Sequence, residues 1–174
     1  MATLRIGLEF PEPYPVVSFP NGVEPITNVN FAGINNTTPA SSSVALEDFT
    51  AIQGNVAPGG TFHISVQGNT SGNFTTKVNA FIDWNQNGVF DAGEEIQIGD
   101  LTNSTGVDGK TVETDILVPT DAVTGETRMR VMKRWNEYAT PGNSAGYGQA
   151  EDYTITINND PLPEPEIDLA SAAF

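Results

Sequence analysis

Apolar and polar residues alternate along short stretches of this 174-residue chain, and turn-forming residues separate these stretches. Alternation with a period of two is typical of strands that have one buried face. The stretches that we expect to form strands are Leu4–Phe10, Ile26–Phe31, Leu46–Ile52, Thr61–Val66, Thr75–Ile82, Glu95–Leu101, Thr111–Val118, Thr127–Met132 and Asp152–Ile157. Many short strands with frequent turns and no helical period predict an all-β fold, an antiparallel and jelly-roll-like β-sandwich.

Prolines and polar segments indicate where this domain begins and ends. A proline run follows the first expected strand, and proline cannot occupy a central strand because it lacks the amide donor. We therefore expect residues 1–25 to be a lead-in, either a linker or an edge segment that wraps the domain. Residues 26–157 form the expected β-sandwich, in which 33–39 is a turn, and residues 158–174 form an acidic, proline-containing linker.

The charge balance excludes several kinds of partner. Lys and Arg total 7 against 22 Asp and Glu, which gives a net charge of −15. Nucleic acids and anionic lipid surfaces need basic patches, so we expect neither as a partner, and no apolar run is long enough to insert into a membrane. The start of the chain lacks the basic and apolar regions of a signal peptide, and we expect a monomeric module cut from a longer protein.

The stretch Asp83–Glu94 has the oxygen spacing of a calcium loop. Side chains with carboxylate or amide oxygens fall at its first, third, fifth, ninth and twelfth positions, namely Asp83, Asn85, Asn87, Asp91 and Glu94. Gly88 stands at the sixth position, where the chain must turn sharply, and Val89 follows with its backbone carbonyl. The pattern predicts a Ca²⁺ site, with Glu95 as a rival to Glu94; a polar turn without metal is the alternative.

The residues on either side of this loop indicate what kind of site it is. Helices flank the loop of an EF-hand, whereas Lys77–Ile82 and Glu95–Gly99 both have β character. We therefore expect a structural calcium clip at the head of a β-hairpin. The chain has no cysteine, so it has no disulfide to stabilise it, and a bound ion would serve instead.

Two further groups of residues are candidates for binding. Asp48, Glu151 and Asp152 form a possible second metal site, although adjacent strand residues face opposite ways and an ion pair with Arg128 or Arg130 is the alternative. The long glycine-rich loop over 136–149 and its borders are the expected ligand-binding surface. Its aromatic faces and amides suit a sugar ring or a peptide, and the residues are Trp135, Asn136, Tyr138, Asn143 and Tyr147. A role in covering the core is the alternative for the three aromatic residues.

An ordered set of motifs over about 26–157 resembles the GEVED domain family. The motifs are Ile34–Thr37, Glu47–Thr50, Ala80–Glu94, Thr127–Val131 and the closing Gly148–Ile155. The closing motif here is Gly-Gln-Ala-Glu-Asp, so Gln149 replaces its first acidic residue. The resemblance implies an extracellular β-sandwich module of large secreted or surface bacterial proteins, including adhesins and the non-catalytic parts of secreted hydrolases.

The expected function is therefore a calcium-dependent adhesion module that recognises a cell-surface glycan, peptide or protein. A calcium-rigidified spacer without a ligand is the alternative. We do not expect an enzyme, because no nucleophile–base set or catalytic motif is visible and His63 is the only histidine. We expect His63 to be a surface or partly buried residue and Trp84 to pack over the hairpin.

Overall fold

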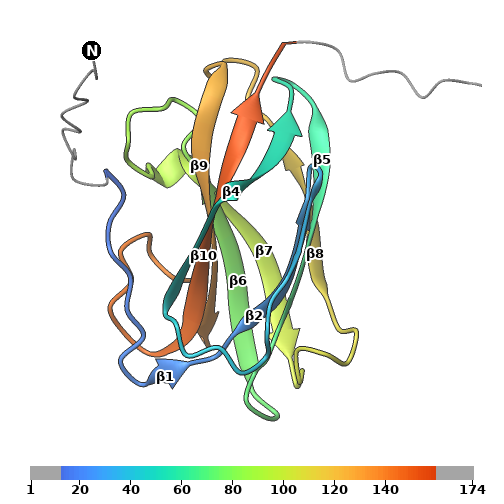
Figure 1. Ribbon diagram of the computed structural model, residues 1–174, viewed down its shortest axis with the longest axis vertical. Coiled ribbons are helices and arrows are strands. Elements are labelled where there is room, and N and C mark those ends of the chain that lie inside the picture. The colour runs from blue at the N-terminus through green and yellow to red at the C-terminus, as the bar shows by residue number, and fades with distance from the viewer. Residues whose placement is uncertain (1–12, 160–174) are drawn as a thin grey trace, which may run out of the picture.

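The computed structural model describes residues 13–159, and almost all of its regular structure is β-strand (Figure 1). The strands are β1 (Gly22–Val23), β2 (Ile26–Phe31), β3 (Ile34–Thr37), β4 (Leu46–Val56), β5 (Thr61–Gly68), β6 (Thr75–Ile82), β7 (Glu95–Thr102), β8 (Val112–Leu117), β9 (Gly125–Trp135) and β10 (Tyr147–Ile157). One short 3₁₀ helix, η1 (Ala92–Glu94), precedes β7. The all-β class is confirmed.

The strands form two facing sheets. A six-stranded sheet has the order β1-β10-β9-β6-β7, with β4 also paired to β10, and a four-stranded sheet has the order β3-β2-β5-β8. Pairing is antiparallel except on the free edge of β10, where β1 and then β4 run parallel to it. The prediction of a wholly antiparallel sandwich is wrong there, because long connections bring β1 and β4 to β10 from distant parts of the chain.

The main core lies between the sheets. Phe31 and Ile64 from the small sheet, and Ile82, Met129 and Tyr153 from the large sheet, are among its fully buried side chains. Alternation places these residues on the inner faces, as the sequence pattern indicates. Trp84 joins this core instead of lying over the hairpin surface, with only 6% of its area exposed.

The large sheet is also covered on its outer face, which a simple alternating pattern does not predict. A second cluster there contains Phe19, Phe81, Phe90, Met132, Ala139 and Ala150. Residues 14–21 and the connection from β9 to β10 supply part of this cover. β6 is therefore buried on both faces along its last five residues, which explains why Ala80-Phe81-Ile82 does not alternate.

The N-terminal segment belongs to the folded unit. Phe19 is buried, Ser18 donates from its backbone to the carbonyl of Asn143, and β1 pairs with β10. The structured unit therefore begins before residue 26. Residues 14–25 lie along the domain as an edge segment, and they are not a linker. The expected strand Leu4–Phe10 and the linker beyond residue 159 lie outside the described residues.

Other differences from the sequence prediction are local. Ile34–Thr37 was expected in a turn, but it forms β3, because the actual turn is the tight pair Ala32-Gly33. Residues 147–149 were expected in a loop, but they begin β10. His63 is an exposed residue as expected, and it contacts Asp115 at 2.8 Å.

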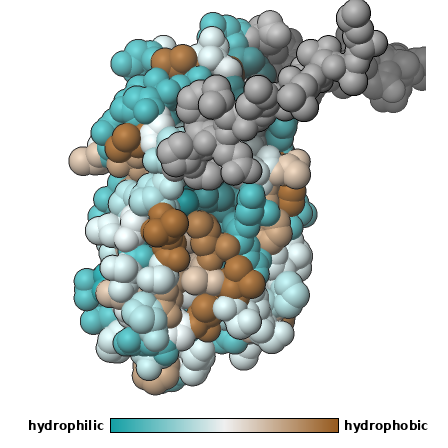
Figure 2. Space-filling view, turned by 60° about the vertical axis from the view of Figure 1, so that its left-hand side comes forward, coloured by the Kyte–Doolittle hydropathy of each residue, from teal (hydrophilic) through white to brown (hydrophobic). Residues whose placement is uncertain are grey.

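Several large apolar side chains are exposed on the described surface, among them Val16, Val107 and Leu117. Figure 2 shows a group of hydrophobic residues amid polar ones on the side of the molecule that lies to the left in Figure 1. In residues 13–159 we find no helix that is long and apolar enough to cross a membrane.

Candidate functional site

The Asp83–Glu94 loop joins β6 to β7 at one end of the sandwich. Phe81 on β6 pairs with Glu95 on β7, so the loop closes an antiparallel hairpin. Its only helical residues are those of η1. The expected arrangement, a loop at the head of a hairpin without flanking helices, is what the structure contains.

Asp83 is the fully buried centre of the first half of this loop. Its Oδ1 accepts the backbone N–H of Asn87 at 3.2 Å, and its Oδ2 accepts that of Gly88 at 2.9 Å. Tyr14 donates its hydroxyl to the same Oδ2 at 2.8 Å. Gly88 has φ +81, a left-handed conformation that glycine adopts without penalty, so the predicted sharp turn is present.

Asp91 and Glu94 organise the second half. Glu94 is 5% exposed, and its Oε1 and Oε2 accept the backbone N–H groups of Asn85 and Asp91 at 3.3 and 2.9 Å. The side-chain amides of Asn85 and Asn87 both donate to Asp91 Oδ2, at 3.0 and 2.9 Å. The five predicted ligand side chains are therefore linked to one another through this loop.

Glu94 and its rival Glu95 have different surroundings. Glu95 leaves the loop and accepts a hydrogen bond from the amide of Asn79 at 2.9 Å. Glu94 alone turns into the loop. The side chain of Val89 is 53% exposed, and its N–H donates to Asn87 Oδ1.

The carboxylates of this loop have no ion-pair partner among the described residues, although the guanidinium of Arg130 lies 5.6 Å from the ring centroid of Phe90. Among residues 13–159, no Lys, Arg or His nitrogen lies within ion-pair distance of Asp83, Asp91 or Glu94. Burial, and to a smaller extent the charge of Asp83, raises the pKa of Glu94 despite hydrogen bonds that lower it. In the same residues no three acidic or histidine side chains are close enough to form a metal site by themselves, so a cation here would also need amide or carbonyl oxygens.

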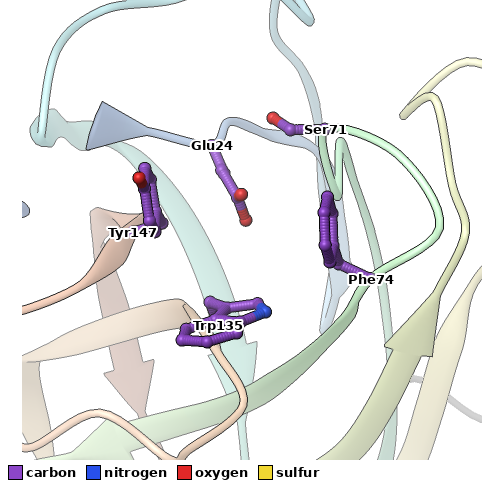
Figure 3. Close-up of a pocket in the computed structure, with 5 residues that line it drawn as sticks. All are labelled: Glu24, Ser71, Phe74, Trp135 and Tyr147. Carbon is purple, nitrogen blue, oxygen red and sulfur yellow. The ribbon is translucent and has the colours of Figure 1, made fainter. Parts of the chain in front are cut away.

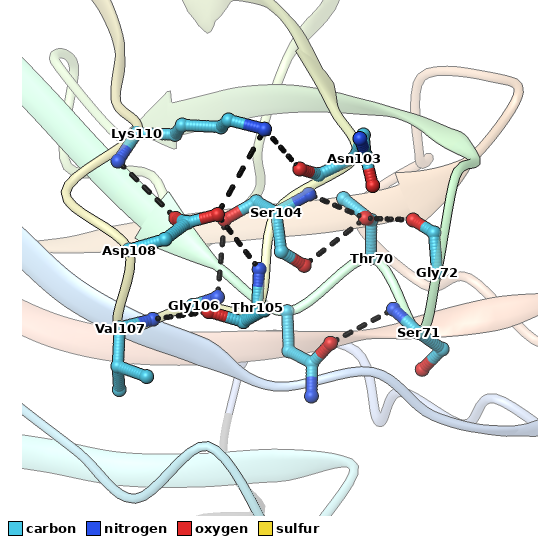
Figure 4. Close-up of polar contacts among 11 residues, drawn as sticks. Thr70, Ser71, Gly72, Asn103, Ser104, Thr105, Gly106, Val107, Asp108 and Lys110 are labelled. Atoms are coloured by element: carbon cyan, nitrogen blue, oxygen red, sulfur yellow. Dashed lines mark hydrogen bonds and ion pairs between the residues drawn. The ribbon is translucent and has the colours of Figure 1, made fainter.

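A second polar loop, Asn103–Lys110, lies at the other end of β7 and supplies a contrast (Figure 4). Asp108 accepts hydrogen bonds there from Ser104 Oγ and from the backbone N–H groups of Thr105 and Lys110, at 3.0, 3.1 and 3.3 Å. The Lys110 ammonium lies 3.8 Å from Asp108 and also contacts the Asn103 carbonyl. This loop therefore contains its own cation.

The possible second metal site is not assembled. Asp152 instead forms a two-pronged ion pair with Arg130, at 2.7 and 2.8 Å, and a further contact of 2.9 Å with Arg128. Arg130 is 1% exposed and also donates to the carbonyls of Pro15 and Pro141. The pair thus fastens the N-terminal segment and the β9–β10 loop to the large sheet. For Asp152 the structure therefore contains the ion pair with arginine that was the alternative to a metal site.

Glu151 and Asp48 also have partners of their own. Glu151 faces the opposite side of β10 from Asp152, is fully buried, and accepts hydrogen bonds from Tyr153 and Thr38 at 2.6 and 3.2 Å. Burial raises the pKa of Glu151 to about 7. Asp48 accepts the hydroxyl and the N–H of Thr50. Asp48, Glu151 and Asp152 therefore do not converge on one point.

Two of the predicted ligand residues meet in a small pocket at the end where β9 and β10 join β1 (Figure 3). We call it the aromatic pocket, and its lining residues are Glu24, Ser71, Phe74, Trp135 and Tyr147. Trp135 and Tyr147 pack edge to face, with ring centroids 6.4 Å apart and an interplanar angle of 89°. Both rings, and that of Phe74, are 40–51% exposed.

The other predicted ligand residues lie elsewhere. Asn143 is 3% exposed, and its amide holds the loop by donating to the carbonyls of Ser18 and Ala145, so the expectation of a ligand contact there is not supported. Asn136 is an exposed turn residue with φ +62. Tyr138 lines a separate cavity beside Asp91 and Glu95, where Lys77 lies 5.1 Å from its ring centroid.

Sequence reasoning missed Glu24, Phe74 and the role of Gln149. Glu24 and Phe74 stand alone in segments distant from residue 135, and only the fold brings them to the pocket. Gln149 is fully buried; its Oε1 accepts the N–H of Ile26 at 2.7 Å, and its Nε2 donates to the carbonyl of Val44 at 2.8 Å. An amide meets both needs, whereas a carboxylate has no proton to donate to Val44.

These features define an all-β domain of two facing sheets with an oxygen-rich hairpin loop. The family model described as the GEVED domain matches residues 77–156, so the resemblance that the motifs indicate is confirmed over this part of the chain. The match spans β6 to β10 and includes the whole Asp83–Glu94 loop.

Comparisons with other proteins add little. No curated protein matches the chain. One solved structure, of X-ray photoreduction in a polysaccharide monooxygenase CBM33, is 18% identical with a TM-score of 0.29. The alignment covers 60% of this chain and 58% of that one, and such a likeness carries no argument about function.

Proposed function

We propose that this domain is a calcium-dependent, extracellular binding module of a bacterial surface or secreted protein, with a glycan or peptide as its ligand. The observation that carries this proposal is the Asp83–Glu94 loop, which places three carboxylates in twelve residues, none of them in an ion pair among the described residues. A divalent cation is the simplest partner for such a loop.

The residues of the loop fit Ca²⁺ by type and by fold. Hard oxygens are the ligands that Ca²⁺ prefers, and Asp83, Asp91 and Glu94 carry charged ones. The amides of Asn85 and Asn87 now donate to Asp91, and each would turn its oxygen inward to an ion. The ion would offset the repulsion between Asp83 and Glu94 and fix the hairpin end, which is a structural role.

The proposal of ligand binding is supported by the aromatic pocket. Three exposed rings lie next to a carboxylate in this pocket, and aromatic faces with few polar groups are typical of ligand sites. An extracellular location is consistent with the −15 charge and with the resemblance to surface proteins. No nucleophile–base pair is part of either site, so we propose no catalytic activity.

A combined glycan and peptide array tests the proposal. The domain is applied in calcium and again with chelator, beside the Trp135→Ala/Tyr147→Ala variant. We expect selective binding in calcium that the variant loses and that chelator weakens. The Leu117→Ala variant, which removes an exposed apolar side chain from β8, is the matched control and should bind normally.

Two results would contradict the proposal in different ways. A blank array in calcium, with a domain that still takes up calcium, would favour the spacer function. Binding that is identical in chelator would leave a recognition module but remove calcium from it.

A further inference from the structure

The aromatic pocket has walls from four separate parts of the chain. Glu24 follows β1, Ser71 and Phe74 belong to the β5–β6 connection, Trp135 ends β9, and Tyr147 begins β10 (Figure 3). Figure 3 shows the Glu24 carboxylate pointing into the space between the three rings. The cavity volume is about 270 Å³, which is below the usual range for drug-sized ligands.

The walls are held in place before any ligand arrives. The ring of Tyr147 packs on the backbone of Gly22, where an added Cβ would lie 3.2 Å from the ring. Gly22 also pairs with Tyr147 in the sheet, and Trp135 buttresses Tyr147 edge to face. A preformed pocket loses little conformational entropy on binding.

The polar content of the pocket is small and negative. Glu24 is 4% exposed, and on its inner side it contacts Lys133, with Nζ to Oε2 at 3.4 Å. Lys133 is fully buried and is not among the residues that line the pocket. A ligand in the pocket therefore meets the carboxylate and the ring faces, and it does not meet the ammonium.

We propose that the aromatic pocket binds the alkylammonium end of a lysine side chain on a partner peptide. The inference rests on the proposed function, since it names the ligand chemistry of that binding module. Cations are attracted to aromatic faces within about 6 Å of the ring centroid, and rings grouped around a cation strengthen this attraction. The methylene stem of a lysine packs on the same rings.

Charge and shape favour this ligand over a glycan. A sugar needs several hydrogen-bonding groups around its ring, whereas this pocket offers Glu24 and Ser71. The chain carries −15, so a basic peptide is also attracted at long range, and that attraction weakens as salt rises.

Titration followed by ¹H–¹⁵N NMR tests the inference on the whole chain in calcium. The probes are Nα-acetyl-lysine amide, its Nε-trimethyl form and Nα-acetyl-norleucine amide, which is a neutral analogue of nearly the same stem. The indole N–H of Trp135 reports binding, and that of Trp84, in the core, is the internal reference. We expect both cations to shift the Trp135 signal with an affinity about tenfold above that of norleucine.

Variants locate the binding. Phe74→Leu and Trp135→Leu remove exposed rings and should each weaken lysine binding about threefold or more, whereas Tyr138→Leu should not. The backbone amide of Tyr147, which lines the same pocket, reports binding in all three variants. Glu24→Gln with Lys133→Met removes the buried pair together, leaves no unpaired charge, and should reduce the preference for lysine over norleucine, while the three rings keep part of it. If this double variant does not fold, the two ring variants still decide the outcome.

Other outcomes overturn the inference. Equal affinity for lysine and norleucine would leave an apolar pocket and a binding module, but no cation site. If none of the three probes binds, the pocket does not bind lysine. If the domain binds a glycan on the array and the same ring variants abolish that binding, the pocket binds a glycan. In either case the proposed binding module is not contradicted.

Discussion

The two polar loops at the ends of β7 stabilise the negative charge of an aspartate in different ways. Each wraps backbone N–H groups around an aspartate: Asn87 and Gly88 around Asp83, and Thr105 and Lys110 around Asp108. The Asn103–Lys110 loop then adds the ammonium of Lys110. The Asp83–Glu94 loop instead adds Asp91 and Glu94, which makes the local charge more negative.

This difference shows what backbone donors can and cannot do. A few N–H groups stabilise one carboxylate, as the lowered pKa of Asp108 indicates, where hydrogen bonds from Thr105, Ser104 and Lys110 outweigh partial burial. In the other loop burial raises the pKa of Glu94 even though N–H groups contact both its oxygens. When a loop holds more anions than its N–H donors can stabilise, an added cation increases its stability.

The largest effect that we expect is that of calcium on stability. A ligand present at a thousand times its dissociation constant adds about 4 kcal/mol to the free energy of unfolding, and for a domain of this size that raises Tm by roughly 10 °C. Thermal melting in calcium and in chelator measures this difference. Equal Tm values in the two buffers would mean that calcium does not stabilise the domain, and the proposed difference between the loops would be lost.

The effect of Glu94→Gln on the stability of the domain should depend on whether calcium is present. Glu94→Gln removes an anion beside Asp83, but it also replaces one of the two oxygens that accept N–H groups from Asn85 and Asp91 with an NH2 group, so we expect only a small loss of stability in chelator. In calcium the same change removes a charged ligand and should forfeit most of the calcium-dependent rise in Tm.

Asp108→Asn is the matched control for that experiment. It should lower Tm by a similar, modest amount with and without calcium, because Lys110 and the backbone donors lose their anion in both. A calcium-dependent effect of Asp108→Asn would break the contrast between the loops.

The two loops should also respond to pH in opposite directions. The raised pKa of Glu94, above its ordinary 4.5, gives stability that is full below pH 4.5 and is lost as pH rises through the folded value. The lowered pKa of Asp108, below its ordinary 3.8, gives stability that is present above pH 3.8 and is lost as pH falls. Urea unfolding in calcium-free buffer, with Glu94→Gln and Asp108→Asn, measures each slope.

Glu151 must be removed from that measurement, because its pKa of about 7 gives a slope of the same sign as Glu94. The series is therefore made in a Glu151→Gln background, where a glutamine keeps the contacts to Tyr153 and Thr38 within reach. If Glu94→Gln leaves the slope above pH 4.5 unchanged in this background, the account of Glu94 is wrong.

The smallest expected effect is that of Lys110→Met. Lys110 is a half-exposed partner of Asp108, and surface ion pairs contribute little and are screened by salt. We expect a Tm close to that of the parent at high salt and slightly below it at low salt. A large loss would mean that the cation, and not the backbone donors, holds the Asn103–Lys110 loop.

The sequence predicted the parts of the molecule that depend on local pattern. Strands such as Thr61–Val66 and Thr75–Ile82 alternate or are β-rich, and both appear as β5 and β6 with those residues. The Asp83–Glu94 hairpin was visible because its oxygen spacing and Gly88 are contained in one short segment.

Features that depend on distant pairing were not predictable. The parallel pairing of β4 with β10 joins segments about a hundred residues apart, and no local pattern encodes it. The same holds for the aromatic pocket, where Glu24 and Phe74 join Trp135. Asn143 was expected to contact a ligand, but its buried amide donates to Ser18, which belongs to the N-terminal segment that the sequence did not place against this loop.

Calorimetric titration with Ca²⁺ tests the central claim most directly. The proteins are the parent chain, Asp91→Asn and Asp108→Asn, and Asp91 is chosen because it is exposed, so that its variant should fold. We predict saturable binding by the parent and by Asp108→Asn, and at least about tenfold weaker binding by Asp91→Asn, since one charged ligand is lost. No calcium uptake by the parent, or an unchanged affinity in Asp91→Asn, would contradict the assignment of the Asp83–Glu94 loop as the calcium site.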